Sequence, residues 1–174
     1  VAKLSWQGAV HALRFKAQYS DEKSDETYLG LTDVDFGHSP DRRYGLSTPD
    51  QMSNEHKGFS VAWDWQLATD AALTTTVYRN EFHRDWFKLS GGGKLISAAN
   101  QGDLDAQAVL DGEQDSSGLS YKHNNRRYIS EGLQTNLAWD LGSHSLSLGA
   151  RYHQDEVDRL QPTEKYDQID GSLL

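Results

Sequence analysis

Apolar and polar residues alternate along several stretches of this chain, and this pattern restricts the possible folds more than any other feature. The clearest run, Leu13–Tyr19, reads Leu-Arg-Phe-Lys-Ala-Gln-Tyr, and Phe59–Leu67 and Leu146–Tyr152 follow the same rule. Alternation with a period of two is typical of a β-strand with one apolar face. We therefore expect an all-β chain with antiparallel strands at approximately residues 1–6, 10–19, 59–67, 71–89, 127–139 and 144–153.

The connections between these predicted strands are alternately short and long. Short turns separate the members of each pair, whereas long polar loops cover approximately residues 20–58, 90–126 and 154–174. Outer-membrane barrels have short periplasmic turns and long extracellular loops. The pattern therefore favours a segment of an antiparallel transmembrane β-barrel. Six strands are too few to close such a barrel, which needs at least about eight, so we expect residues 1–174 to be part of one larger barrel domain.

Three tryptophans support a membrane location for these strands. Trp6, Trp65 and Trp139 each lie near the end of a predicted strand that leads into a short turn. Tryptophan favours the level at which hydrocarbon meets water, so rings at the same end of successive strands indicate one aromatic girdle of a membrane barrel. Aromatic residues toward the opposite strand ends are expected to form the second girdle: Tyr19, Phe82, Trp86, Tyr128 and Tyr152.

Composition excludes several other classes of protein. Only 36% of the 174 residues are hydrophobic, and no apolar run approaches the roughly 20 residues of a spanning helix. The absence of cysteine excludes thiol catalysis and disulfides. A net charge of -9 argues against nucleic acid as a partner.

A soluble extracellular β-sandwich that binds carbohydrate would show the same alternation, and this alternative stays open. The regular change between short turns and long loops favours the barrel. Within the second long loop, residues 103–110 are expected to form a short helix that begins at an aspartate cap, Asp103.

No motif indicates an enzyme. Gly91-Gly92-Gly93-Lys94 ends like a phosphate-binding loop but lacks that loop's earlier glycine and its final serine or threonine. The seven histidines have no spacing typical of a metal site. We expect no catalytic residues, no metal site and no intrinsic cofactor.

Several segments resemble the barrel of a TonB-dependent outer-membrane receptor, most closely receptors of the ferric-dicitrate type. They are Ser24–Asp33, Pro40–Tyr44, Asn54–His56, Leu73–Trp86 and Gly149–His153, which include the runs Ser-Asp-Glu-Thr-Tyr-Leu-Gly-Leu and Gly-Ala-Arg-Tyr-His. The resemblance implies part of a barrel of about 22 strands in the outer membrane of a Gram-negative bacterium. It also implies a transporter that takes up a ferric chelate, either a siderophore or ferric citrate.

The implied partners follow from the family. They are the ferric chelate, outer-membrane lipid with its lipopolysaccharide, and the TonB complex, which would act through a plug and a TonB box. No segment of residues 1–174 resembles the plug or the TonB box, so we expect an internal barrel fragment.

A ferric chelate of a hydroxy acid is anionic, and arginine holds carboxylates with two parallel hydrogen bonds. Candidate ligand-binding residues therefore lie in or next to the long loops: Arg42, Arg43, Tyr44, Tyr28, Arg79, Arg84 and Arg127. The alternative for each arginine is an ion pair with a nearby acid, such as Asp41, Glu81 or Asp85, or a contact with lipopolysaccharide phosphate.

Overall fold

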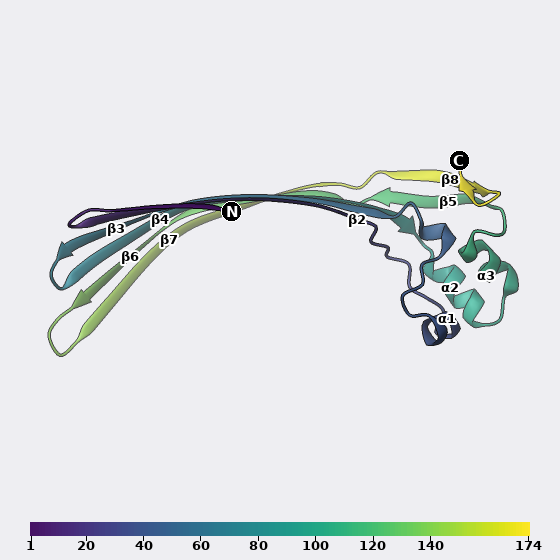
Figure 1. The fold of residues 1–174 in the computed structure, drawn as a ribbon, viewed down its shortest axis with the longest axis horizontal. Helices are drawn as coiled ribbons and strands as arrows, with labels where there is room; N and C mark the ends of the chain where they lie inside the picture. Colours follow the sequence, from purple (N-terminus) through teal and green to yellow (C-terminus); the bar gives the residue numbers. More distant parts are fainter. The chain divides into compact units, whose positions relative to one another are not determined.

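The computed structural model describes residues 1–174 and confirms an all-β chain of mostly antiparallel strands, with 61% of residues in strands and 14% in helices. Figure 1 shows the elements along the chain. In chain order they are β1 (Ala2–Gln7), β2 (His11–Ser24), α1 (Asp33–His38), η1 (Gly45–Ser47), β3 (Gln51–Ala68), β4 (Ala71–Ser90), α2 (Gly93–Asn100), α3 (Leu104–Asp111), β5 (Ser116–His123), β6 (Asn125–Asp140), β7 (Ser145–Leu160), β8 (Thr163–Ile169) and β9 (Ser172–Leu173).

The chain divides into two compact units, each built from three segments of sequence. We call the first the sheet unit; its segments are Val1–Asp21, Glu55–His83 and Arg127–Asp158. We call the second the mixed unit, because it holds the helices as well as strands; its segments are Glu22–Asn54, Arg84–Arg126 and Arg159–Leu174.

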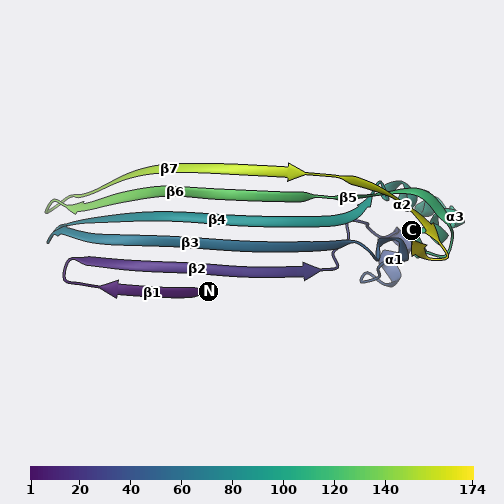
Figure 2. The ribbon, with the colours of Figure 1, turned by 90° about the horizontal axis from the view of Figure 1, so that it is seen from above.

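The sheet unit is a single layer of strands in the order β1-β2-β3-β4-β6-β7 (Figure 2). Antiparallel pairing places Leu4 opposite Phe15 and Trp6 opposite Leu13. The β1–β2, β3–β4 and β6–β7 connections are short. The backbone N–H of Gly8 closes the first by donating to the carbonyl of His11 at 2.7 Å.

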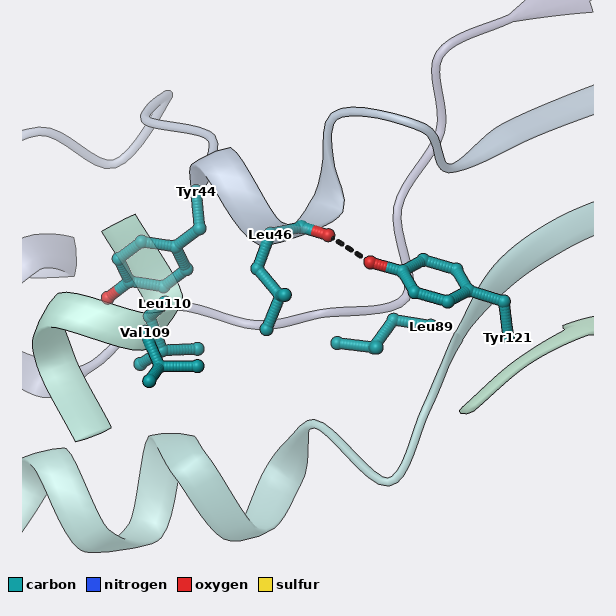
Figure 3. Packing of buried hydrophobic residues seen from close by; sticks show 6 residues of the cluster. All are labelled: Tyr44, Leu46, Leu89, Val109, Leu110 and Tyr121. Atoms are coloured by element: carbon teal, nitrogen blue, oxygen red, sulfur yellow. Dashed lines mark hydrogen bonds between the residues drawn. The ribbon is translucent and has the colours of Figure 1, made fainter. Parts of the chain in front are cut away.

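The mixed unit contains a hydrophobic core, whose six buried residues are drawn in Figure 3. Residues of η1, α2, α3 and the strands β4, β5, β8 and β9 contribute to it or pack against it. The end of β4 pairs with β5, so that Leu89 lies opposite Tyr121, and β5 then pairs with β8. Tyr121 is fully buried, and its hydroxyl gains a hydrogen-bond partner by donating to the carbonyl of Leu46 at 2.5 Å. The core consists of Tyr44, Leu46, Leu89, Val109, Leu110 and Tyr121.

The helix predicted at residues 103–110 is confirmed as α3. Its first turn is capped by the Asp103 carboxylate, which accepts from the backbone N–H of Ala106 at 3.1 Å. The helix ends at Gly112, whose φ of 84° is the left-handed conformation that glycine adopts without strain. This helix buries Val109 and Leu110 in the core.

The long loops are more ordered than the sequence predicts. The region 90–126 contains α2, α3 and β5, and the region 154–174 contains the end of β7 together with β8 and β9. At the first loop, β2 continues to Ser24 and β3 begins at Gln51. The additional strand residues were missed because strands pair through their backbones, and such pairing does not require apolar and polar residues to alternate in the sequence.

None of the α-helices is long and apolar enough to cross a membrane.

Candidate functional site

One face of the sheet unit is apolar and open to the surroundings. Leu4, Trp6, Leu13 and Phe15 lie on it as directly opposed pairs. On β3, Trp63 joins the same face, because its indole N–H donates to the His11 ring at 3.3 Å and His11 alternates in phase with Leu13. The apolar side chains are exposed rather than covered: Phe15, Phe59, Trp63, Trp65, Leu67, Val77, Leu133, Leu146 and Leu148.

The opposite face of the same strands is polar. Asp64 links two neighbours there, accepting from Arg14 at 2.9 Å and from the Thr74 hydroxyl at 2.8 Å. Arg151 donates to the Tyr78 hydroxyl at 2.9 Å. An open hollow of about 510 Å³ lies beside Thr74 and Arg151 and is lined mainly by polar side chains. The sheet therefore separates an apolar surface from a hydrophilic one.

The three tryptophans that were predicted to form one aromatic girdle lie at one end of this sheet. Trp6, Trp65 and Trp139 stand near the ends of β1, β3 and β6, at the strand ends that enter the short connections. Each is at least 36% exposed. The Trp63 and Trp65 rings stack with their centroids 5.5 Å apart. The three indoles therefore form a row at one end of the exposed apolar face.

The residues predicted for the second girdle divide between the two faces. Tyr19 and Tyr152 are exposed and alternate in phase with Phe15 and Leu148, so they lie on the apolar face. Phe82 and Tyr128 contact each other at 6.1 Å between ring centroids, and Phe82 shares the phase of Tyr78 on the polar face. Trp86 continues the phase of Phe82 along β4 and contacts Lys88. The placement of Phe82, Trp86 and Tyr128 in one girdle with Tyr19 and Tyr152 is therefore corrected.

Beyond the apolar band, the same face carries ion pairs. Arg79 pairs with Glu131, and Arg127 pairs with Glu81 at 2.7 Å. Both arginines were candidates for ligand binding, and the structure gives each an acidic partner instead. The alternative interpretation, pairing with a nearby acid, describes both of them.

Arg42 and Tyr44 are tied into the mixed unit by α1. The Arg42 guanidinium pairs with Asp35 at 2.7 Å and with Asp111, and it lies over the Tyr44 ring at 4.9 Å. The Tyr44 hydroxyl donates to Asp35 at 2.5 Å, which lowers the pKa of that carboxyl. Tyr44 is 1% exposed, so it packs the core and presents no surface to a ligand.

Arg43 fastens two stretches of backbone together. Its guanidinium donates to the carbonyls of Ser47, Thr48 and Asp50, with the last at 2.7 Å, and also to the carbonyl of Asp25. Four acceptors occupy the donors of the fork. Among the predicted arginines, Arg43 is the one most completely committed to holding the fold.

Arg84 and Tyr28, the remaining candidates, lie in a cluster that sequence reasoning did not assemble. Its centre is Lys88, which is 6% exposed and has its ammonium 3.6 Å from the centroid of the Tyr28 ring and 3.8 Å from that of Trp86. The Trp86 indole N–H donates to the carbonyl of Glu26 at 3.0 Å, which holds the segment with Tyr28 against β4. We call Tyr28, Arg84, Trp86, Lys88 and Lys122 the cationic cluster.

The cationic cluster is electrostatically unbalanced. Burial lowers the pKa of Lys88, and the positive charges of Lys122 and Arg84 lower it further, whereas the carboxylate of Asp50 opposes the shift. Lys122 lies directly opposite Lys88 in the antiparallel pair of β4 and β5. Like charges directly opposite on two strands repel. The sequence contained one sign of this cluster, since Arg84, Trp86 and Lys88 share one phase of a predicted strand, but the lysine of β5 fell in a predicted loop.

Asp50 is the buried acid whose charge acts on Lys88 of the cationic cluster. It is 0% exposed and accepts from the Thr27 hydroxyl at 2.7 Å and from the backbone N–H of Leu89 at 2.8 Å. Burial raises the pKa of Asp50 above its ordinary value of 3.8, and these hydrogen bonds oppose that rise.

Asp50 should give the mixed unit a definite pH dependence. A carboxyl whose pKa is higher in the folded than in the unfolded state stabilises the fold fully below the unfolded pKa of 3.8, and this contribution is lost as pH rises through the folded pKa. The difference in free energy of unfolding, wild type minus Asp50→Asn, should therefore fall as pH increases through that window. Denaturant titrations of both chains at a series of pH values measure it; a difference that rises with pH would contradict the assignment.

No family model, no curated protein and no solved structure matches this chain. We therefore infer function from the two faces of the sheet unit, the cationic cluster of the mixed unit and the resemblance of the sequence segments.

Proposed function

We propose that this chain is part of the wall of a transmembrane β-barrel, and that the barrel is a TonB-dependent outer-membrane receptor that takes up a ferric chelate. The observation that carries the proposal is the division of the sheet unit into an exposed apolar face and a polar face. In a barrel of this kind the apolar face contacts lipid, and the polar face lines the interior.

The dimensions of the apolar face support the proposal. From Phe59 to Leu67, the alternating apolar residues of β3 span about 26 Å at about 3.3 Å per residue. A strand tilt of about 40° reduces this to roughly 20 Å across the membrane, close to the apolar band of about 25 Å on outer-membrane barrels. Trp65 stands at one end of this stretch, and the ion pairs of Arg79 and Arg127 on the same face lie toward the other.

The edges of the sheet unit also support a larger barrel. β1 pairs only with β2, and β7 pairs only with β6. Each edge therefore presents a row of backbone donors and acceptors to another strand. Further strands of the same barrel are the natural partners, because a closed barrel leaves no edge in the membrane.

The alternative, a soluble β-sandwich that binds carbohydrate, requires a second sheet over the apolar face. Residues 1–174 contain one connected sheet, and Phe15 and Leu148 on its apolar face are exposed. This observation favours the barrel.

Lipid contact is tested by placing the same charge on either face of one strand. Leu148 points to the apolar face, whereas Ser147, its neighbour on β7, alternates in phase with Arg151 on the polar face. Leu148 lies near the start of β7, between the level of Trp139 and the centre of the apolar face. We therefore expect Leu148→Arg to lower the free energy of unfolding from the bilayer by about 1–2 kcal/mol, between the penalties for arginine at the interface and at the midplane. Ser147→Arg should change it by much less.

The measurement is urea titration of the complete barrel that contains this segment, refolded with vesicles and followed by tryptophan emission. Equal effects of the two arginines would remove the membrane proposal. The cargo is tested separately, by growth of a strain that lacks the parent receptor on a panel of ferric chelates. Growth unchanged on every chelate would reject iron uptake and leave the membrane result standing.

A further inference from the structure

The cationic cluster holds two opposed lysines and an arginine, and its one nearby acid, Asp50, offsets only part of this charge. Lys88 and Lys122 face each other across β4 and β5, and neither forms an ion pair with an acidic side chain, whereas Arg42, Arg79 and Arg127 all do. Lys88 differs from the other lysines without an ion pair because it is buried, with 6% of its surface exposed. An unneutralised buried charge destabilises a fold, so its retention points to a role outside folding.

Orphaned polar atoms lie on the neighbouring strands of the same unit. The Nε–H of Arg84 is buried and has no hydrogen-bond partner, and the same is true of the Ser24 hydroxyl and the side-chain carbonyl of Asn54. Buried polar groups are nearly always hydrogen-bonded in folded proteins. The Nε–H of Arg84 and the hydroxyl of Ser24 could each donate a hydrogen bond to an oxyanion.

The aromatic rings keep Lys88 charged and in position without neutralising it. Tyr28 and Trp86 contact the ammonium through their π-faces, and such contacts attract a cation while leaving its net charge in place. Asp50, which is also near, is held by Thr27 and the backbone of Leu89. The ammonium is thus oriented and only partly compensated.

We propose that the cationic cluster of the mixed unit is a binding site for a small molecule that carries at least two oxyanion groups. One oxyanion lies between Lys88 and Lys122 and relieves their mutual repulsion, and a second accepts from Arg84. A single charge satisfies only one of these two positions, because Arg84 and Lys88 are separate donors on the same strand phase of β4. Carboxylates and phosphates share this chemistry.

The inference deepens the proposed uptake of an anionic chelate, and it rests on that proposal only where the bound anion is identified with the cargo. Binding itself is a property of the mixed unit. It is therefore measured on the full chain in detergent, where neither membrane insertion nor uptake enters the result.

The experiment is calorimetric titration of the full chain with citrate, with inorganic pyrophosphate and with acetate. We expect citrate or pyrophosphate to bind, and acetate, with one charge, to bind at least about tenfold more weakly. Lys88→Met should weaken binding about tenfold or more, because a charge-assisted contact is lost. Lys94→Met removes one charge from an exposed position on α2 and should change affinity less than about twofold.

Two further variants separate a binding role from a structural one. Arg84→Lys keeps the charge but removes the Nε–H, and it should weaken binding. Lys88→Met should raise the midpoint of thermal unfolding while it weakens binding, because it removes a desolvated charge. A merely structural lysine would give the opposite sign of stability change.

Each outcome decides the question. Binding of citrate alone assigns a carboxylate ligand, binding of pyrophosphate alone assigns a phosphate ligand, and binding of both supports the shared oxyanion chemistry. Absence of binding by both would overturn the inference, and so would an equal loss in Lys88→Met and Lys94→Met, which would show non-specific attraction. Either failure would leave the lipid-facing test of Leu148 and Ser147 unaffected.

Discussion

Replacing Leu110 by alanine is expected to lower the free energy of unfolding of the mixed unit by about 2–5 kcal/mol. Leu110 is 0% exposed and packs in the only hydrophobic core of the chain, with Tyr44, Leu89 and Tyr121. Truncation removes the transfer free energy of the side chain and leaves a cavity that the surrounding rings fill only partly. Chemical denaturation followed by near-ultraviolet circular dichroism measures the loss.

The chain offers a matched control on the same helix. Leu104 begins α3 and is 81% exposed, so Leu104→Ala deletes the same atoms from a solvated position. We expect a change within about 0.5 kcal/mol, typical of surface substitutions. Similar losses in the two variants would mean that α3 does not pack as described.

Arg43→Met should destabilise the mixed unit by about 3 kcal/mol or more, because hydrogen bonds to a charged group contribute about 1.5–3 kcal/mol each. The guanidinium joins the carbonyl of Asp25 to those of Ser47 and Asp50, and Ser47 and Asp50 are almost fully buried. Methionine fills similar space but leaves these carbonyls without a donor. The same denaturation experiment reports the effect.

Arg159 provides the comparison for Arg43, because it is exposed on β7 within the mixed unit. Arg159→Met should leave the midpoint nearly unchanged. A stable Arg43→Met that lost anion binding would reverse the interpretation and return Arg43 to the ligand site. Loss of binding in an Arg42→Ala, Arg43→Ala double variant is therefore interpretable only beside its stability.

The strands of the sheet unit were predictable because their side chains meet two different surroundings. Runs such as Phe59–Leu67 alternate for that reason, and the structure confirms a strand there within β3. The turns beside Trp6 and Trp139 were visible for the same reason, since the alternation stops where the backbone reverses. The helix after Asp103 was predictable from a local cap that needs no tertiary contact.

The mixed unit was not predictable, because its order comes from contacts between distant residues. Leu46 and Tyr121 meet across 75 positions of sequence, and Gln168 donates to the carbonyl of Val109 across 59. No period or motif encodes such pairs. The sequence supplied arginines as candidates, but tertiary neighbours decided the partners of their donors: Arg43 donates to carbonyls and Arg127 to Glu81, whereas the Nε–H of Arg84 has no partner.

The discontinuous origin of the mixed unit has a consequence for the order in which the chain acquires structure. Its three segments are separated by segments of the sheet unit, and its core joins Tyr44 to Leu110 and Tyr121. Tyr44 leaves the ribosome long before either partner exists, so its ring stays unburied while the intervening hairpins are synthesised. Contacts of such long sequence separation form slowly. We therefore expect a long period during synthesis in which the nascent chain exposes apolar side chains and depends on a chaperone that prevents aggregation.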